Sequence, residues 1–265
     1  MRIATWNINS VRLRSGLLAR LIRQHQPDVI CLQETKCPPG QFPTSEFKAL
    51  GYGHVAENGF TGHHGVAIIS RLPFDSVQAH AFCGKADGRH VSITFNARNL
   101  IVHSFYIPAG GDEPDPATNP KFQHKLAFLD EMNQWVQAQL EDSIQNHVFA
   151  GDFNIAPLEH DVWSHKQLLK VVSHTPVETG LLNALQRDCG LHDPIRAHMP
   201  EPQKLYSWWS YRSRDWETSD RGRRLDHIWV SKALADKCRG AAILKQVRGW
   251  DRPSDHVPIL VDVLD

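Results

Sequence analysis

The sequence predicts a layered α/β fold, and two observations carry this prediction. Short apolar runs rich in Val, Ile and aromatic residues are typical of strands, and they are mixed with segments whose apolar residues recur at helical spacing. The two kinds of segment alternate irregularly, which favours a layered domain over a simple strand–helix–strand repeat. The 265 residues, 41% hydrophobic and 22% charged, are typical of a soluble globular protein.

Eight short runs bounded by turn or helix signals are the expected strands. Several of them are apolar on consecutive residues, which indicates that both faces of the sheet are covered. The runs are 2–6, 27–33, 65–70, 91–95, 100–107, 147–153, 225–231 and 258–263.

Three helices are expected. In the first, apolar residues over 11–22 recur at helical spacing, with Ser10 as the N-cap and Pro27 after the end. A second apolar stripe spans 122–140 behind Pro120, and a third helix is expected near 181–189. The intervening segment 108–120 holds four prolines and two glycines, which predicts a long loop of the kind that often carries function.

Bulk properties exclude several classes of protein. No apolar run approaches the ~20 residues of a membrane span, and the first residues turn polar before a signal peptide can form, so we expect a cytoplasmic protein. The five cysteines have no paired spacing, which suggests neither a disulfide framework nor a zinc site. The formal net charge is zero, so binding to nucleic acid requires charges segregated onto one face.

Glu34 comes directly after the apolar run 28–33. A carboxylate at a strand end can meet a cation above a sheet, and Mg²⁺ prefers one or two carboxylates with water and substrate phosphate. Asn7 and Asn9, on one face of an extended segment, can bind the same cation or its waters. Taken alone, Glu34 is more simply a solvated loop residue, and Asn is common at strand ends.

Asp152 and Asn154 follow the run 148–150 and Gly151, a residue that allows another backbone to approach closely. Asp152 can orient or deprotonate an attacking water, and Asn154 can donate a hydrogen bond to that water or to a phosphate. An Asx-type turn that closes the strand is an equally good interpretation of these residues.

Asp255 and His256 precede the last expected strand, and adjacent residues on an extended chain point in opposite directions. One can face a metal, and the other a phosphate whose negative charge a protonated histidine stabilises. His256 then needs an orienting carboxylate, for which Asp226 is the best candidate. A turn histidine is the simpler interpretation of His256 alone, but one site built from strand ends explains all these residues together.

Six segments, in order and over nearly the whole length, resemble the exonuclease III family of the endonuclease/exonuclease/phosphatase superfamily. They are 6–12, 26–36, 64–68, 151–157, 206–212 and 253–258. The resemblance implies a four-layer αββα sandwich of two mixed β-sheets flanked by helices, formed by one catalytic domain over 1–265. It also implies Mg²⁺ or Mn²⁺ as cofactor.

The resemblance further assigns residues to roles. The implied main metal ligand is Glu34, with Asn7 close by and Asp255 in reach. Asp152 and Asn154 complete the implied metal-binding set. Asp152 would activate water, Asn154 and Tyr106 would hold the phosphate or the reacting oxygens, and His256, paired with Asp226, would contact the phosphate.

The segment 206–224 bears on the substrate, because it places Trp side chains among five arginines. Aromatics stack on bases at ~1–3 kcal/mol each, and arginines neutralise phosphates. A Trp-rich core hairpin with a solvated tip explains the composition slightly better, since three acids dilute the charge, but the match to the family favours DNA. The implied DNA-binding residues are Trp208, Leu225, Arg212 and Trp209, of which Trp208 and Leu225 would wall an abasic-sugar pocket.

The expected function is therefore that of a Mg²⁺-dependent DNA repair phosphodiesterase. It would be a 3′→5′ exodeoxyribonuclease with 3′-phosphatase and abasic-site endonuclease activity, and its partner would be double-stranded DNA with 3′ ends or abasic sites. A phosphoesterase of the same fold that acts on RNA or a small phosphate ester is the alternative. A monomer is the default expectation.

Three departures from the family bear on substrate choice. Ala109 stands where relatives often carry Asn or Gln, which removes a contact to phosphate. Asn9 replaces the Asp of animal relatives, although it agrees with bacterial ones, and is expected to weaken a second metal position. The His- and Lys-rich segment 158–179 matches only part of the family, and a bulky His165 near the site would favour frayed 3′ ends over internal abasic sites.

Overall fold

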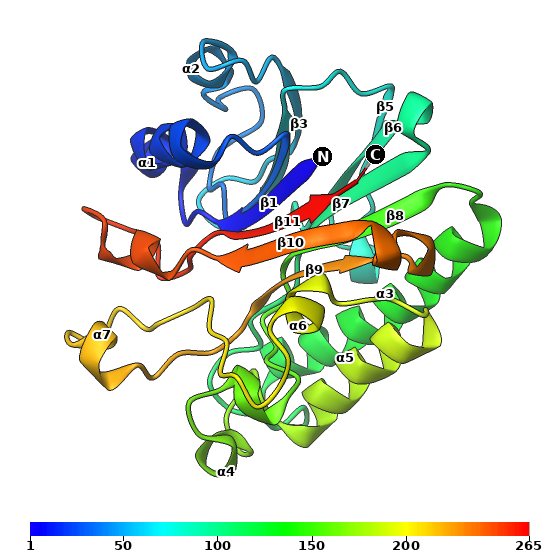
Figure 1. Ribbon diagram of the computed structural model, residues 1–265. Helices are drawn as coiled ribbons and strands as arrows, with labels where there is room; N and C mark the ends of the chain where they lie inside the picture. The colour runs from blue at the N-terminus through cyan, green and yellow to red at the C-terminus, as the bar shows by residue number, and fades with distance from the viewer. Residues whose placement is uncertain (265) are drawn as a thin grey trace.

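Two β-sheets are stacked at the centre of the molecule (Figure 1). The computed structural model describes residues 1–264. The first sheet has the order β10-β11-β1-β2-β4-β3 and the second the order β5-β6-β7-β8-β9. The strands of the first sheet are β10 (Cys238–Ile243), β11 (Ile259–Val263), β1 (Arg2–Asn7), β2 (Val29–Gln33), β4 (Val66–Ser70) and β3 (His54–Asn58). Those of the second are β5 (Ser76–Gln78), β6 (His90–Phe95), β7 (Leu100–Tyr106), β8 (Asn146–Asp152) and β9 (Asp226–Val230).

Each sheet is mixed and contains one parallel pair of strands. In the first sheet β1 runs parallel to β2, with Asn7 opposite Gln33. In the second, β7 runs parallel to β8, with Tyr106 opposite Asp152. The other strand pairs are antiparallel. Because parallel strands end at the same edge, each pair brings two chain segments to one end of its sheet.

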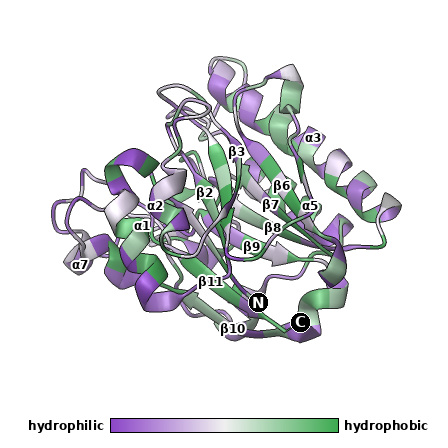
Figure 2. Cartoon of the chain, turned by 90° about the horizontal axis from the view of Figure 1, so that it is seen from above, coloured by the Kyte–Doolittle hydropathy of each residue, from purple (hydrophilic) through white to green (hydrophobic). Residues whose placement is uncertain are grey.

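Helices cover the outer face of each sheet, so the predicted four-layer sandwich is confirmed. Figure 2 shows α1 (Val11–His25) on one side of the strands and α3 (Pro120–Asp142) with α5 (Pro176–Asp188) on the other. One apolar core lies between the sheets and one under each helical layer. The remaining short helices are α2 (Thr44–Lys48), α4 (His165–Leu168), α6 (Pro194–His198) and α7 (Trp216–Ser219).

Apolar side chains on both faces of the strands explain the continuous apolar runs of the sequence. On β1, Ile3 points into the core between the sheets, while Ala4 and Trp6 point into the core under α1. Burying a side chain of the size of Ile3 contributes about 1.5–3 kcal/mol to the free energy of folding. Among residues 1–264, no helix combines the length and apolar character that crossing a membrane requires. All five cysteines are free thiols.

The eight predicted strands are present, but three further strands were missed. β3, β5 and β10 all lie at sheet edges, where one side of the strand needs no apolar cover. β5 is exposed along its whole length, and β10 contains a glycine and a register shift. Such strands carry too weak an apolar pattern to be recognised from sequence.

The helices differ from the predictions in one cap and one boundary. Ser10 precedes α1 but makes no capping bond with its side chain, because its backbone N–H donates to the carbonyl of Glu34 and holds it at φ 85°. The third helix begins at Pro176 rather than near 181, where Thr175 and Glu178 form a capping box.

Three buried histidines form a hydrogen-bonded row across the outer face of the second sheet. His90 Nε2 lies 3.1 Å from His103 Nδ1, and His103 Nε2 lies 3.0 Å from His147 Nδ1. Burial lowers the pKa of His90 to about 3 and that of His103 well below its usual value. A fourth histidine, His227, is also buried, and burial lowers its pKa to about 3. These rings therefore stay neutral in the fold while they titrate near 6.5 in the unfolded chain.

We expect the free energy of unfolding to fall as the pH drops below about 6.5. The unfolded chain then binds protons that the folded protein excludes, so each such histidine removes about 1.4 kcal/mol per pH unit. Urea titrations at pH 7.5, 6.0 and 5.0 measure this slope. Equal midpoints at all three pH values would contradict the assignment of neutral buried histidines.

Candidate active site

The ends of the two parallel strand pairs meet at one edge of the sandwich. Asn7 is the last residue of β1, and Glu34 follows β2 directly in a left-handed conformation, with φ 48°. Tyr106 ends β7 and Asp152 ends β8. Gly151 has φ 149°, and a Cβ there would clash with the carbonyl oxygen of Phe105. The backbone at Gly151 thus approaches the backbone of β7 closely, as expected, and this places Asp152 against β7.

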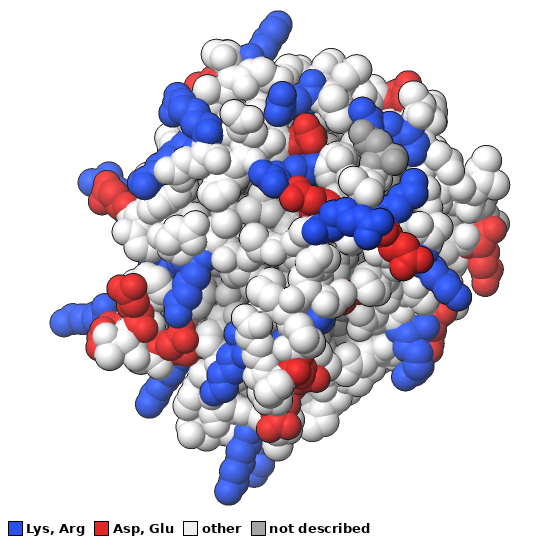
Figure 3. Space-filling model, in the orientation of Figure 1, with Lys and Arg blue, Asp and Glu red and all other residues white. Residues whose placement is uncertain are grey.

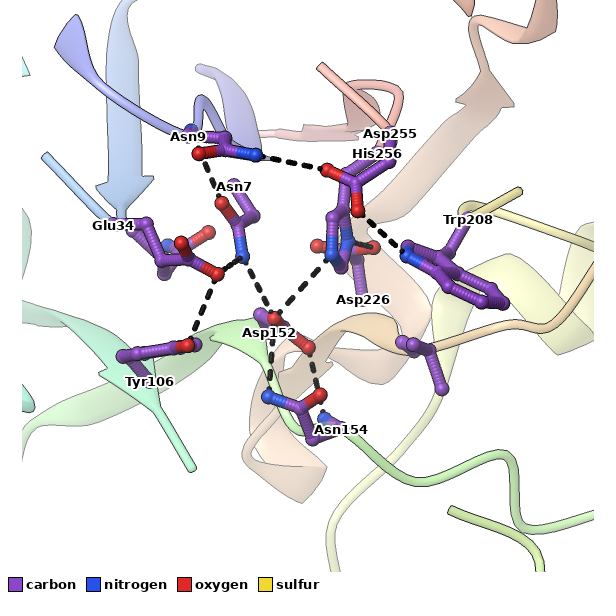
Figure 4. A network of polar contacts seen from close by, with 12 residues as sticks. Asn7, Asn9, Glu34, Tyr106, Asp152, Asn154, Trp208, Asp226, Asp255 and His256 are labelled. Atoms are coloured by element: carbon purple, nitrogen blue, oxygen red, sulfur yellow. Dashed lines mark hydrogen bonds and ion pairs between the residues drawn. The ribbon is translucent and has the colours of Figure 1, made fainter. Parts of the chain in front are cut away.

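The four end residues form one network of polar contacts (Figure 4). The Asn7 amide donates to Glu34 Oε1 and to Asp152 Oδ2, each at 2.9 Å. The Tyr106 hydroxyl donates to the same Glu34 oxygen at 3.0 Å. Asn7 thereby joins a carboxylate of the first sheet to a carboxylate of the second.

Glu34 is held as a carboxylate. Burial opposes this charge, but the hydrogen bond from Asn7 and the nearby charge of Lys36 outweigh burial and lower the pKa of Glu34. Lys36 Nζ lies 2.9 Å from Glu34 Oε2 and donates to Asn9 Oδ1 at 2.7 Å. Lys36 was not predicted to take part in the site, although it lies two residues after Glu34.

His256 lies between two buried carboxylates, of which Asp226 is the predicted partner. Its Nδ1 is 2.8 Å from Asp226 Oδ2, which also accepts from the Ser207 hydroxyl at 2.7 Å. On the other side of the ring, Nε2 is 3.7 Å from Asp152 Oδ2. Burial disfavours the imidazolium, but Asp226 and Asp152 outweigh it and raise the pKa of His256 to about 10. His256 is therefore protonated at neutral pH.

Asp152 has the opposite balance. Burial raises the pKa of Asp152 to about 7. The positive charge of His256 opposes this rise, and the negative charge of Asp226 adds to it. A carboxyl group that titrates near neutral pH is suited to accept a proton from a water molecule. Asp152 and His256 together can thus deprotonate a nucleophile and stabilise a phosphate.

Asn154 closes the end of β8 and lines the site as well. Its backbone N–H donates to Asp152 Oδ1 at 2.9 Å, which is the Asx-type turn considered above. Its side-chain amide donates to the Ile107 carbonyl at 2.9 Å and to Asp152 Oδ2 at 3.2 Å. The turn fixes Asn154 beside the carboxylate, so the structural and functional interpretations are compatible.

Asp255 points away from His256, as neighbours on an extended chain must. Its carboxylate accepts from the Trp208 indole at 3.0 Å and from the Asn9 amide at 3.2 Å (Figure 4). Asp255 is therefore linked to Glu34 indirectly, through Asn9 and then through either Lys36 or Asn7. This arrangement places Asp255 at the rim of the network rather than inside it.

A cavity of about 720 Å³ opens above these residues. Glu34, Tyr106, Asn154, Asp255 and His256 form its polar end, with Asn7 and Asp152 buried beneath. Of the expected DNA-binding residues, Trp208, Leu225 and Arg212 line this cavity, and so does Ala109.

Trp209 does not reach the cavity, and a direct contact with DNA is no longer expected. Its side chain is 1% exposed and packs under the first sheet, where its indole donates to Asp220 at 3.0 Å. Trp208 and Trp209 point to opposite sides of one extended segment. Only the tertiary structure decides that Trp208 faces the cavity.

The donor set at Glu34 fits a hard divalent cation. Mg²⁺ takes one or two carboxylates and completes its shell with water and phosphate, and Glu34 offers a charged carboxylate that faces the cavity. The buried group of Asp152, Asp226 and His256 also has ligand atoms within 4.8 Å of one another. Within that group His256 Nδ1 and Asp226 Oδ2 are 2.8 Å apart, a hydrogen-bond distance, so these two atoms already partner each other.

Two buried residues beneath the cavity were not foreseen. Lys125 of α3 donates to the carbonyls of Asn154 and Ala109 at 2.8 and 3.3 Å and forms an ion pair with Glu178. The capping box that begins at Thr175 is the one sequence signal that could have identified Glu178. No sequence pattern marks Lys125.

Comparisons with known proteins agree with this geometry. The sequence pattern of the Endonuclease/Exonuclease/phosphatase family matches residues 4–256. The chain is 33% identical to exodeoxyribonuclease III of Haemophilus influenzae over 98% of both chains. The solved structure of the 3′ phosphatase NExo from Neisseria, bound to a product DNA hairpin, matches with a TM-score of 0.91 at 28% identity and covers 100% of both chains. An AP endonuclease from Archaeoglobus fulgidus matches with a TM-score of 0.90 at 27% identity and covers 99% of both.

A match of this extent, together with strand ends that assemble acid–base residues of the expected types, identifies the family. The chain belongs to the endonuclease/exonuclease/phosphatase family, within which it is similar to exodeoxyribonuclease III.

Proposed function

We propose that this protein is a divalent-metal-dependent DNA repair phosphodiesterase. It removes nucleotides and 3′-phosphates from the 3′ ends of double-stranded DNA, and abasic-site incision is its third proposed activity. The observation that carries the proposal is the contact of His256 with Asp226 and Asp152 beside Glu34, at the floor of a cavity walled by Trp208. The named activities of the relatives support DNA as the substrate.

The proposed chemistry is hydrolysis of a phosphate ester. Asp152 accepts a proton from the attacking water, while protonated His256 stabilises the charge on the phosphate oxygens. Tyr106 and Asn154 position the phosphate or the attacking and leaving oxygens. Asp226 holds the ring of His256 through Nδ1, so that Nε2 faces the reacting group.

Mg²⁺ or Mn²⁺ is the proposed cofactor, with Glu34 as its main ligand. When bound, such a cation polarises the phosphate and lowers the pKa of bound water. Asn7 would contribute through its amide oxygen, which in the structure accepts from the Asn9 N–H at 3.1 Å. Asp152, Asn154 and Asp255 lie close enough to this end of the cavity to support the bound ion or its waters.

DNA is proposed to be bound by individual arginines at the cavity, and not by a large positively charged surface. On the face shown in Figure 3, cationic and anionic side chains lie beside one another instead of gathering by sign. The arginines at the cavity, among them Arg212, Arg221 and Arg223, would neutralise backbone phosphates. A monomer in the cytoplasm is the proposed state, and the free thiols are compatible with a reducing compartment.

Two labelled duplexes with Mg²⁺ test the proposal. One carries an internal abasic-site analogue, and the other has a recessed 3′ end with a 3′-phosphate. Cleavage of both would support the full proposal, whereas processing of the second alone would restrict it to 3′ ends and would agree with the loss of a phosphate contact at Ala109. If neither duplex is cut and an RNA duplex is, the substrate class is wrong.

A further inference from the structure

The cavity continues past Trp208 to a second aromatic side chain, Trp163. Trp163 lines the same cavity as Trp208 and the catalytic residues. Its backbone is held on both sides, because its N–H donates to the Gly222 carbonyl at 3.2 Å and its carbonyl accepts from Lys204 at 3.1 Å. The preceding residue, Val162, forms a β-bridge with Arg223. Trp163 is therefore a fixed wall of the cavity.

Each of the two aromatic walls has an arginine over its ring. The Cζ atom of Arg221 lies 4.7 Å from the ring centre of Trp163, and that of Arg223 lies 5.2 Å from the ring centre of Trp208. Both arginines line the cavity. Arg223 is further anchored by hydrogen bonds to Val172 and Ser173 at 3.1 and 2.8 Å. Cations at this distance are attracted to the ring faces and restrict their movement.

Part of the cavity lining beside the two walls is apolar. Leu225 and Val171 line the cavity, and they pack with Trp163 and Trp208 on a small cluster that includes the buried Ala156, Val162 and Leu168. Trp163 is only half-buried and lines the cavity, so part of its ring is accessible from the cavity. Aromatic walls with arginines beside them and apolar lining residues suit a planar aromatic group that is attached to a phosphate.

We propose that Trp163, with Arg221 behind it, forms a subsite for the base of the 3′-terminal nucleotide that is removed. The catalytic groups at one end of the cavity fix the scissile phosphate, and the nucleoside attached to that phosphate extends along the cavity to Trp163. An abasic sugar or a 3′-phosphate offers no aromatic face to this wall. The inference rests on the proposed function and makes intact 3′-terminal nucleotides a preferred substrate class.

The reaction at this subsite is an ordinary hydrolysis. Water attacks the phosphorus, the bond from phosphorus to the 3′ oxygen of the preceding nucleotide breaks, and that oxygen takes up a proton. The products are a nucleoside 5′-monophosphate, whose base lies against Trp163, and a shortened strand with a 3′-hydroxyl group. No oxidant or other co-reactant is required.

Kinetics of Trp163→Ala on two duplexes test the subsite. One duplex ends in an unmodified 3′ nucleotide and the other in a 3′-phosphate on the same sequence. Loss of one base stack lowers kcat/KM for nucleotide removal by about five- to hundredfold relative to removal of the 3′-phosphate. Trp163→Phe retains a ring face and restores most of the ratio. Trp250→Ala is the matched control, because Arg20 lies 4.2 Å over the Trp250 ring but the pair lies outside the cavity.

Product binding provides a readout without turnover. Without metal, quenching of tryptophan fluorescence is used to compare deoxyadenosine 5′-monophosphate with deoxyribose 5-phosphate. The wild type should prefer the nucleotide, and Trp163→Ala should lose that preference. Equal losses on both duplexes, or a preference that Trp163→Ala retains, would overturn the subsite. If the wild type cuts neither duplex but keeps the preference, the proposed function fails while the base subsite stands.

Discussion

Asp152→Asn is expected to abolish turnover while DNA binding persists. Asp152 is the proposed proton acceptor, and a general base contributes about 10²–10⁴ to the rate. The substitution keeps the shape of the side chain, which lies between Asn7, Asn154 and His256. Single-turnover rates and DNA binding of the wild type and Asp152→Asn measure the two effects separately.

The control for this variant is Asp112→Asn. Asp112 lines the same cavity but is not among the residues that form the polar network described above. Removing its charge should leave the single-turnover rate close to that of the wild type. If Asp152→Asn is as active as wild type, the assignment of Asp152 is wrong. If both variants lose activity equally, the loss reflects cavity charge and not a specific base.

Lys125→Met is expected to lower the free energy of unfolding by about 3–5 kcal/mol, because it leaves a buried carboxylate unpaired. Lys125 and Glu178 are both completely buried and form an ion pair. Burial lowers the pKa of Lys125, and Glu178 opposes that effect. Urea unfolding near pH 7.5 measures the loss.

The same variant should weaken activity through the cavity walls. Lys125 donates hydrogen bonds to the carbonyls of Ala109 and Asn154. Both carboxylate oxygens of Glu178 accept from the Ser173 N–H, each at 3.0 Å. The pair therefore joins three loops that frame the cavity. Lys121→Met, four residues earlier on α3 at an exposed position, is the control and should change neither quantity.

A double substitution separates charge from packing. Lys125→Met with Glu178→Gln removes both charges, so part of the lost free energy should return, and the double-mutant cycle gives the coupling energy. Exposed ion pairs contribute less than about 1 kcal/mol to the free energy of unfolding. If Lys125→Met lowered that free energy by no more than this, the buried pair would not stabilise the fold as proposed.

Several of the proposed site residues could be recognised from the sequence because they lie beside a local apolar run. Glu34, Asp152 and His256 are polar residues where a strand stops, and strand periodicity is a local property that needs no tertiary information. The buried strands were found for the same reason. The edge strands β3, β5 and β10 were missed, because an edge strand can remain polar or exposed.

Local sequence by itself thus determined the fold class, most strands, the three longest helices and the residue types of the site. Only the tertiary structure decided which residues meet. Asn7 joins Glu34 to Asp152 across the two sheets, and Lys125 finds Glu178 from a separate helix. Trp208 faces the cavity while Trp209 is buried. The physical reason is that contacts between distant segments depend on sheet stacking and strand register, which short-range patterns do not contain.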